Sequence, residues 1–295
     1  MTDEFKGIFA ALTTPFVEDE ISPDNFKQNI LKYNSSDLAG YVVLGTSGES
    51  PYLSDQESER LVQTAREWAA PEKKIIVGTA RESAKLTAEF TNRMAEFQID
   101  AALIRTPSYY KSRLTGEALK AYYLTIADTS RVPVIIYHNP LHTGLSIDLE
   151  LIVELSQHPN IIGMKDSSGN LAFMSELASR VTQEFSILLG AGGILLAGWS
   201  MGAIGGILAL AAVAPDHCTE LYRLFREGQI EEARMLQVKL IPLNKALTQT
   251  MGVPAIKYAL DAVGLFGGLP RLPLLTLSEA EKQKLEGMLE KLDLL

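Results

Sequence analysis

The runs PVIIY (133–137) and IIGMK (161–165) decide the fold, because each is a short, continuously apolar segment that ends in a polar residue. Such runs are typical of strands buried on both faces of a parallel sheet. Six further runs share this character: IFAALT (8–13), YVVLG (41–45), KIIVG (74–78), AALIRT (101–106), SILLG (186–190) and AIGGIL (203–208). Segments with helical spacing separate them. Eight strands alternating with helices predict an α/β protein with a (β/α)8 TIM barrel, and an open doubly wound sheet is the alternative.

The helical segments indicate where the barrel ends. SDQESERLVQTAREWAA (54–70) begins with Ser54 followed by Glu57, which is a capping-box pattern. From Asp216 onward the chain contains only helical patterns, with Pro254 suited to a first helical turn and Ser278 to an N-cap. We therefore predict a (β/α)8 catalytic core over residues 1–215. A C-terminal helical appendage, which includes the last barrel helix, is predicted over 216–295.

Composition limits the partners and the cellular setting. The formal net charge of −9 disfavours nucleic acid and anionic membranes as partners. The single cysteine, Cys218, cannot form an intrachain disulfide, and Cys and His do not cluster at metal-ligand spacing. The N-terminal sequence lacks the apolar run of a signal peptide, and no stretch reaches the ~18 apolar residues of a spanning helix. We expect a cytoplasmic protein with no metal site.

Two polar side chains close neighbouring strands of the predicted barrel. Active sites of such barrels form at the carboxyl ends of the strands. Lys165 ends IIGMK, where poor solvation favours a neutral amine that attacks a ketone. Its alternative is a solvent-exposed lysine or one paired with Asp166. Tyr137 ends the preceding strand and is suited to proton transfer, with a rim aromatic as the alternative.

Two loops supply further candidates. GTSGES (45–50) combines Gly48 with the hydroxyls of Thr46 and Ser47, so backbone N–H groups and hydroxyls there can converge on a carboxylate. A plain turn is the alternative for this loop. TPSYY (106–110) provides the phenols of Tyr109 and Tyr110, which suit interface packing equally well.

The histidines are the usual candidates for acid–base chemistry. His142 and His138 follow the fifth strand and are candidates for substrate contact, His142 before His138. His158 precedes the sixth strand and belongs to the opposite end of the barrel, and His217 opens the helical region.

Several motifs together resemble one superfamily. GTSGES, TPSYY, YHNPLHTG (137–144), GMKDSSGN (163–170) and AALTTPF (10–16) stand in the order and spacing of the dihydrodipicolinate synthase and N-acetylneuraminate lyase superfamily, over essentially the whole chain. The resemblance implies a barrel with three C-terminal helices, no metal, no dissociable cofactor, and a homotetramer built as a dimer of dimers. It implies a class I aldolase or lyase that acts on pyruvate or a related 2-keto acid.

The resemblance also implies roles for particular residues. Lys165 corresponds to the Schiff-base lysine and Tyr137 to the proton-relaying phenol, while Thr46 and Ser47 correspond to the pair that holds the keto-acid carboxylate. Tyr109 resembles the tyrosine that reaches into the neighbouring subunit's site, with Tyr110 as the other option. Ile207 corresponds to a residue whose backbone faces the keto acid.

The member of the superfamily depends on the loop after the fifth strand. Dihydrodipicolinate synthases carry arginine in a Y-N-x-P-x-R-T-G pattern, where the guanidinium group forms two parallel hydrogen bonds to a second carboxylate. This chain has His142 at that position, and an imidazole cannot form the same pair of hydrogen bonds. The sequences of the segments SQHPNIIGMKDSSG and VPAIKYALDAVG resemble those of the 4-hydroxy-2-oxoglutarate aldolases. Cleavage of a 4-hydroxy-2-keto acid to pyruvate and an aldehyde is the leading prediction. Synthesis of 4-hydroxy-tetrahydrodipicolinate from pyruvate and aspartate semialdehyde is the alternative, and a non-catalytic keto-acid-binding oligomer is a minor one.

Overall fold

The structure is a computed structural model that describes residues 4–295. Eight strands form a closed barrel in the order β1-β10-β9-β8-β7-β6-β5-β4. They are β1 (Gly7–Ala11), β4 (Gly40–Val43), β5 (Lys74–Gly78), β6 (Ala101–Arg105), β7 (Val134–His138), β8 (Ile161–Asp166), β9 (Ser186–Leu189) and β10 (Gly205–Leu208). Each coincides with one of the eight predicted runs. The prediction of a TIM barrel is therefore confirmed, and the open-sheet alternative is wrong.

Strands β6 to β9 pair in parallel and are almost fully buried. Every side chain of β7 and β9 is buried, which explains why these runs are apolar instead of alternating. The register between β7 and β8 places Tyr137 beside Lys165. The next pair along is His138 beside Asp166. Polar residues at the ends of the two apolar runs therefore meet at the carboxyl end of the strands, as predicted.

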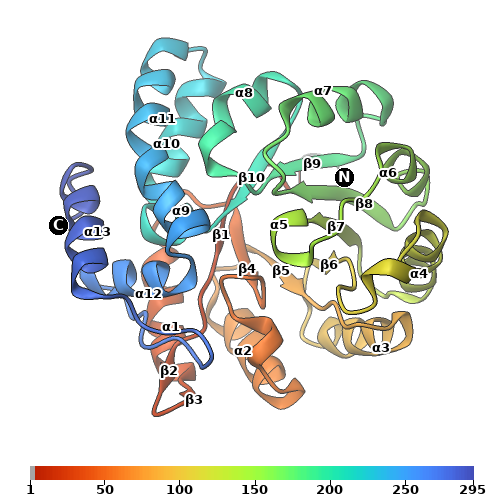
Figure 1. Cartoon of the computed structure of the whole chain (residues 1–295), viewed down its shortest axis with the longest axis horizontal. Helices are drawn as coiled ribbons and strands as arrows, with labels where there is room; N and C mark the ends of the chain where they lie inside the picture. Colours follow the sequence, from red (N-terminus) through yellow and green to blue (C-terminus); the bar gives the residue numbers. More distant parts are fainter. Residues whose placement is uncertain (1–3) are drawn as a thin grey trace. The chain divides into compact units, whose positions relative to one another are not determined.

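The chain divides into two compact units. The first contains Lys74–Gly206 together with the segment that ends at Lys6, and the second contains Gly7–Lys73 and Ile207–Leu295. In the first unit, helices α3 (Ala84–Ala95), α4 (Gly116–Thr129), α6 (Leu149–Leu155) and α7 (Leu171–Arg180) contact one another in chain order and lie outside strands β6 to β8 (Figure 1). The short helices α5 (Pro140–Thr143) and α8 (Leu195–Ser200) follow β7 and β9.

The second unit holds the first two helices and all the C-terminal ones. Helices α1 (Pro23–Tyr33) and α2 (Asp55–Trp68) pack together, and a small hairpin of β2 (Phe16–Val17) and β3 (Glu20–Ile21) precedes them. After β10 come α9 (Leu210–Val213), α10 (Pro215–Arg226), α11 (Ile230–Lys245), α12 (Val253–Ala262) and α13 (Glu279–Glu290). A π-helical turn at Ala246–Thr250 separates α11 from α12. The boundary predicted after residue 215 stays a prediction.

The predicted helix ends are present. Ser54 and Glu57 form the complete capping box at the start of α2, and Ser278 forms a second one with Glu281 at the start of α13. Pro254 lies in the first turn of α12. Among the helices of residues 4–295, none combines the length and the hydrophobicity that a membrane crossing requires.

Candidate active site

Lys165 and Tyr137 form the centre of the candidate site. Both side chains are buried, with 5% and 6% of their surface exposed, so the alternatives of a solvent-exposed lysine and a rim tyrosine are wrong. Lys165 Nζ lies 4.2 Å from the centroid of the Tyr137 ring. Within residues 4–295, no carboxylate forms an ion pair with Lys165. A buried amine beside a phenol, without an acidic partner, is suited to attack on a carbonyl carbon.

Gly190 provides the space for the lysine side chain. A Cβ atom on Gly190 would lie 3.0 Å from Lys165 Cε and 2.0 Å from Ser167 Oγ. The Gly190 N–H donates to the carbonyl oxygen of Asp166 at 2.6 Å, which holds this backbone against the end of β8. The position therefore requires glycine for a close approach.

A buried histidine–aspartate pair lies next to the candidate site along both strands. His138 Nδ1 is 2.7 Å from Asp166 Oδ1, and both side chains are excluded from solvent. Asp166 Oδ2 accepts a hydrogen bond from Ser168 Oγ at 2.9 Å. Asp166 is thus engaged by His138 and Ser168, and its predicted alternative as the partner of Lys165 is wrong. The pair joins the ends of β7 and β8.

His142 lies on the turn formed by α5, immediately after β7. Its Nδ1 is 3.2 Å from Asn139 Oδ1, and Asn139 Nδ2 donates to the Tyr137 hydroxyl at 2.8 Å. Partial burial lowers the pKa of His142, and the nearby positive charge of Lys165 lowers it further. This change favours the neutral form of the imidazole.

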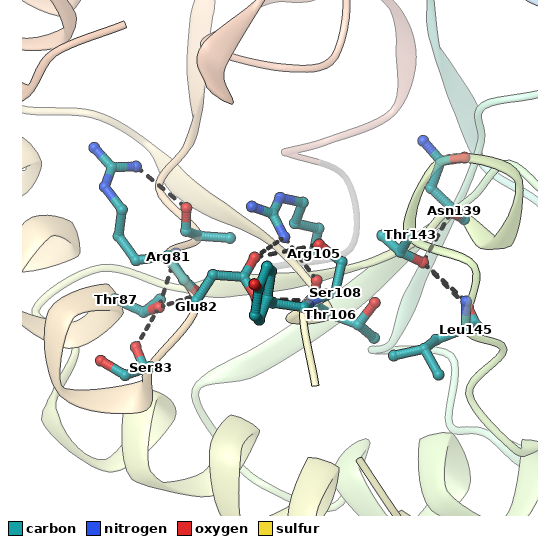
Figure 2. A network of polar contacts seen from close by, with 12 residues as sticks. Arg81, Glu82, Ser83, Thr87, Arg105, Thr106, Ser108, Asn139, Thr143 and Leu145 are labelled. Carbon is teal, nitrogen blue, oxygen red and sulfur yellow. Dashed lines mark hydrogen bonds and ion pairs between the residues drawn. The ribbon is translucent and has the colours of Figure 1, made fainter. Parts of the chain in front are cut away.

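The loop 106–110 is held by one carboxylate. Glu82 accepts hydrogen bonds from the backbone N–H groups of Ser108 at 2.9 Å and Tyr109 at 3.0 Å, and it pairs with Arg105 at 3.1 Å (Figure 2). Partial burial opposes ionisation of Glu82, but these partners outweigh it and lower its pKa. The rings of Tyr109 and Tyr110 meet edge to face and are 78% and 72% exposed. Contact of Tyr109 with a neighbouring subunit stays a prediction.

The loop 45–50 belongs to the second unit and has a compact backbone. Gly48 N–H donates to the Gly45 carbonyl oxygen at 3.1 Å, and Thr14 Oγ1 donates to the Gly48 carbonyl oxygen at 2.7 Å. A Cβ atom on Gly48 would lie 3.2 Å from the Leu12 carbonyl oxygen. Ser47 is buried and Thr46 is half-buried. The predicted carboxylate contact of this loop stays a prediction.

A buried ion pair supports the same loop from the C-terminal helices. Lys257 Nζ on α12 lies 2.7 Å from Glu49 Oε1, with both side chains 1% exposed. Glu49 Oε2 accepts the backbone N–H of Arg271 at 2.9 Å. Burial lowers the pKa of Lys257, and the Glu49 carboxylate opposes that change. The C-terminal region is thereby attached to the loop that carries Thr46 and Ser47.

Ile207 lies on β10 and is 1% exposed. It belongs to the second unit, as the loop 45–50 does, and its predicted backbone contact with substrate stays a prediction. His158 pairs with Asp128 at 3.0 Å, away from the carboxyl ends of the strands, as expected for the stability end of the barrel.

Four supporting residues are not among the residues predicted from the sequence: Asn139, Gly190, Glu49 and Lys257. Asn139 and Glu49 lie inside the quoted motifs YHNPLHTG and GTSGES, so their position was a usable signal. Lys257 follows the proline of VPAIKYALDAVG, and a lysine among the apolar residues of a helix is a weaker signal. Gly190 ends the predicted run SILLG, so its place at the carboxyl end of a strand was a signal, although it is only one of 22 glycines.

Comparison with known proteins identifies the family. The model of the dihydrodipicolinate synthetase family matches residues 4–292. The chain belongs to this family. A 4-hydroxy-tetrahydrodipicolinate synthase of Methanosarcina mazei is 35% identical over 291 residues, which is 98% of each chain. One of Exiguobacterium sibiricum is 34% identical over 277 residues, 94% of each chain. The chain is therefore an enzyme of the lyase class, as predicted.

Solved structures of the family have the same fold. The dihydrodipicolinate synthase of Aquifex aeolicus superposes with a TM-score of 0.94 at 30% identity, over 98% of this chain and 99% of that one. The chloride-inhibited synthase of Acinetobacter baumannii, whose structure contains pyruvate, superposes with a TM-score of 0.93 at 27% identity, over 98% and 99% of the two chains.

Proposed function

We propose that Lys165 Nζ forms an iminium with the carbonyl carbon of a 2-keto acid, with pyruvate as the first candidate. The observation that carries the proposal is a buried lysine, free of a carboxylate partner, 4.2 Å from the ring of Tyr137. The pyruvate bound to the Acinetobacter baumannii synthase supports the choice of keto acid. In the second unit, Thr46, Ser47 and Gly48 are our candidates for holding the keto-acid carboxylate.

The proposed reaction needs only the amine, proton transfers and an aldehyde. The Lys165 amine adds to C2, and the carbinolamine loses water to give the iminium. Loss of a proton from C3 produces an enamine, whose C3 attacks the aldehyde carbon while the aldehyde oxygen takes up a proton. Water then hydrolyses the iminium and releases Lys165. Tyr137 carries the protons that the carbinolamine exchanges.

The relatives favour condensation as the physiological reaction. Both relatives described above are 4-hydroxy-tetrahydrodipicolinate synthases, so the reaction that sequence analysis placed second, condensation with aspartate semialdehyde, moves to first place. That substrate carries a second carboxylate, which needs a cation. We assign this role to Lys111, because its side chain packs against Gly144, which closes the turn that carries His142. A Cβ atom added to Gly144 would lie only 2.5 Å from Lys111 Nζ.

Cleavage of a 4-hydroxy-2-keto acid is the second candidate, and His142 favours it. A neutral imidazole supplies neither the permanent charge nor the paired donors of an arginine, so it disfavours a dianionic adduct. His142→Arg should then raise the synthase activity relative to cleavage.

We also carry forward the expected homotetramer and the cytoplasmic location as proposals. The exposed pair Tyr109 and Tyr110 supports an interface at the loop 106–110. Sedimentation of the wild type and of Tyr109→Ser would show whether this loop maintains the assembly.

Borohydride trapping tests the proposed chemistry directly. Pyruvate plus borohydride should add a stable mass to the wild type at Lys165, because reduction turns the iminium into a secondary amine. Lys165→Met should show no adduct, and Lys85→Met, which changes an exposed lysine, should label like the wild type. Steady-state kinetics with aspartate semialdehyde and with several 4-hydroxy-2-keto acids then rank the two reactions. Absence of the wild-type adduct would refute the Schiff base.

A further inference from the structure

One side chain at the end of β7 and two in the turn that follows form a continuous hydrogen-bonded chain. Asn139 Nδ2 donates to the phenol oxygen of Tyr137 at 2.8 Å, and Asn139 Oδ1 lies 3.2 Å from His142 Nδ1. Asn139 is 5% exposed, whereas His142 is an exposed residue. An amide oxygen only accepts hydrogen bonds, so this contact requires the imidazole proton to be on Nδ1.

The backbone of this turn keeps the three groups in place. The Thr143 N–H donates to the Asn139 carbonyl oxygen at 3.0 Å, and Thr143 Oγ1 donates to the same oxygen at 3.1 Å. Gly144 closes the turn at a φ of 66° by donating to the Pro140 carbonyl oxygen at 2.9 Å. Figure 2 shows Thr143 between Asn139 and Leu145. Asn139 and His142 therefore face each other across one turn. These backbone hydrogen bonds maintain that arrangement.

We propose that Asn139 is a positioning residue that fixes His142 as the Nδ1–H tautomer, so that His142 Nε2 presents a hydrogen-bond acceptor to the substrate. Within residues 4–295, His142 Nε2 has no hydrogen-bond partner. A neutral acceptor nitrogen pairs with a hydroxyl group and repels a carboxylate. The structure thus assigns the C4 hydroxyl of the substrate to His142.

This assignment rests on the proposed Schiff-base function and applies to both of its directions. In cleavage, Nε2 takes the proton of the C4 hydroxyl as the C3–C4 electron pair moves into the iminium, leaving an aldehyde and an enamine. In condensation, the protonated Nε2 returns that proton to the aldehyde oxygen as the same bond forms. The donor on the other side, Asn139 Nδ2, stabilises negative charge on the Tyr137 oxygen and directs its proton away from the amide.

The tautomer can be measured without any activity. The chain has four histidines, so two-bond ¹H–¹⁵N spectra of ¹⁵N-histidine-labelled protein above pH 7.5 resolve each ring, and His142→Gln identifies the signals of His142. We expect the proton on Nδ1 in the wild type. Asn139→Asp should keep it there, because the carboxylate still accepts, whereas Asn139→Val should shift it toward Nε2. A wild-type proton on Nε2 would overturn the proposal, because the amide would then be reversed.

Kinetics test the role of the acceptor. His142→Phe should lower kcat by roughly tenfold or more in both directions, and His142→Gln, whose side-chain oxygen accepts, should recover part of the loss. Pyruvate trapping at Lys165 should be unchanged in both variants, because C4 is not involved. A kcat within about twofold of wild type in His142→Phe, with trapping intact, would refute this inference alone. Loss of trapping in the wild type would refute the proposed function, while the tautomer spectra would still be informative.

Discussion

Replacement of Lys257 by methionine should destabilise the protein strongly, because it leaves a carboxylate buried without its partner. Lys257 Nζ and Glu49 Oε1 are 2.7 Å apart, and both side chains are 1% exposed. Removal of one member of such a pair costs about 3 to 5 kcal/mol of unfolding free energy. Methionine preserves most of the volume of the lysine stem, so a cavity contributes little. The ammonium group would also stop donating to the Leu269 carbonyl oxygen, which it contacts at 2.8 Å.

Replacement of the other partner, Glu49→Gln, should lower the unfolding free energy by less than Lys257→Met does. In Glu49→Gln the lysine keeps the Leu269 carbonyl and the face of the Phe16 ring, whose centroid is 4.2 Å from Nζ. Burial already lowers the pKa of Lys257, so the amine can lose its proton when the carboxylate is gone. The double variant should be more stable than Lys257→Met alone, since a neutral amide needs no counter-charge.

Urea unfolding measures these differences through the midpoint and the slope. The matched control is Lys85→Met, which breaks an exposed pair with Glu89 whose charged atoms are 3.8 Å apart. That change should alter the unfolding free energy by less than about 0.5 kcal/mol. If Lys257→Met lowered the unfolding free energy by less than about 1 kcal/mol at an unchanged slope, Lys257 and Glu49 would not be strongly coupled. The Michaelis constant for the keto acid is a second readout, because Glu49 belongs to the loop that carries Thr46 and Ser47.

Tyr137→Phe should lower turnover by about 100-fold while the circular dichroism spectrum stays unchanged, and a near-normal rate would exclude a role in proton transfer. Gly190→Ala should slow borohydride trapping, because the added Cβ would lie 2.0 Å from Ser167 Oγ and 3.0 Å from Lys165 Cε, so both side chains must move; unchanged trapping kinetics would contradict this. The hydrogen bond from Arg271 lowers the pKa of Glu57, so its contribution is present above the unfolded value of about 4.3 and is lost as the pH falls through the lower folded value. Glu57→Gln should therefore lower the unfolding free energy by about 1.5 to 3 kcal/mol at pH 7 and by much less at pH 3. Urea unfolding at both pH values measures this difference, and an equal loss at the two pH values would show that the charge of Glu57 is irrelevant.

The barrel could be predicted because its strands are marked locally. A strand buried on both faces must be apolar along its length, and a helix terminus needs a capping side chain, so both leave a pattern within a few residues. The positions of Lys165 and Tyr137 followed from the same patterns, since each residue ends an apolar run. Neighbouring strands in the chain are neighbours in the barrel, which placed the two side chains together.

The supporting contacts could not be predicted in this way because they depend on side-chain positions in the folded state. Lys257 and Glu49 are far apart in the chain, and neither residue indicates the other. Asn139 lies within three residues of both Tyr137 and His142, yet only the closed turn at Gly144 brings its amide between them. The alternative in which Lys165 pairs with Asp166 fails for a related reason: the two residues are adjacent in sequence, whereas strand geometry pairs Asp166 with His138.

The contact between His138 and Asp166 also bears on the register between β7 and β8 at the candidate site. Successive residues of a strand point to opposite faces, so Tyr137 and Lys165 share one face while His138 and Asp166 share the other. The pairing of β7 with β8 shifts between Val134 and Ile135, so the register at the carboxyl end differs by one residue from the register at the start of the two strands. A slip of one residue would place His138 beside Lys165, and Asp166 would keep its hydrogen bonds from Ser168 but lose the contact with His138. Loss of the buried His138–Asp166 contact disfavours that alignment, and the same contact therefore helps to keep the phenol beside the amine.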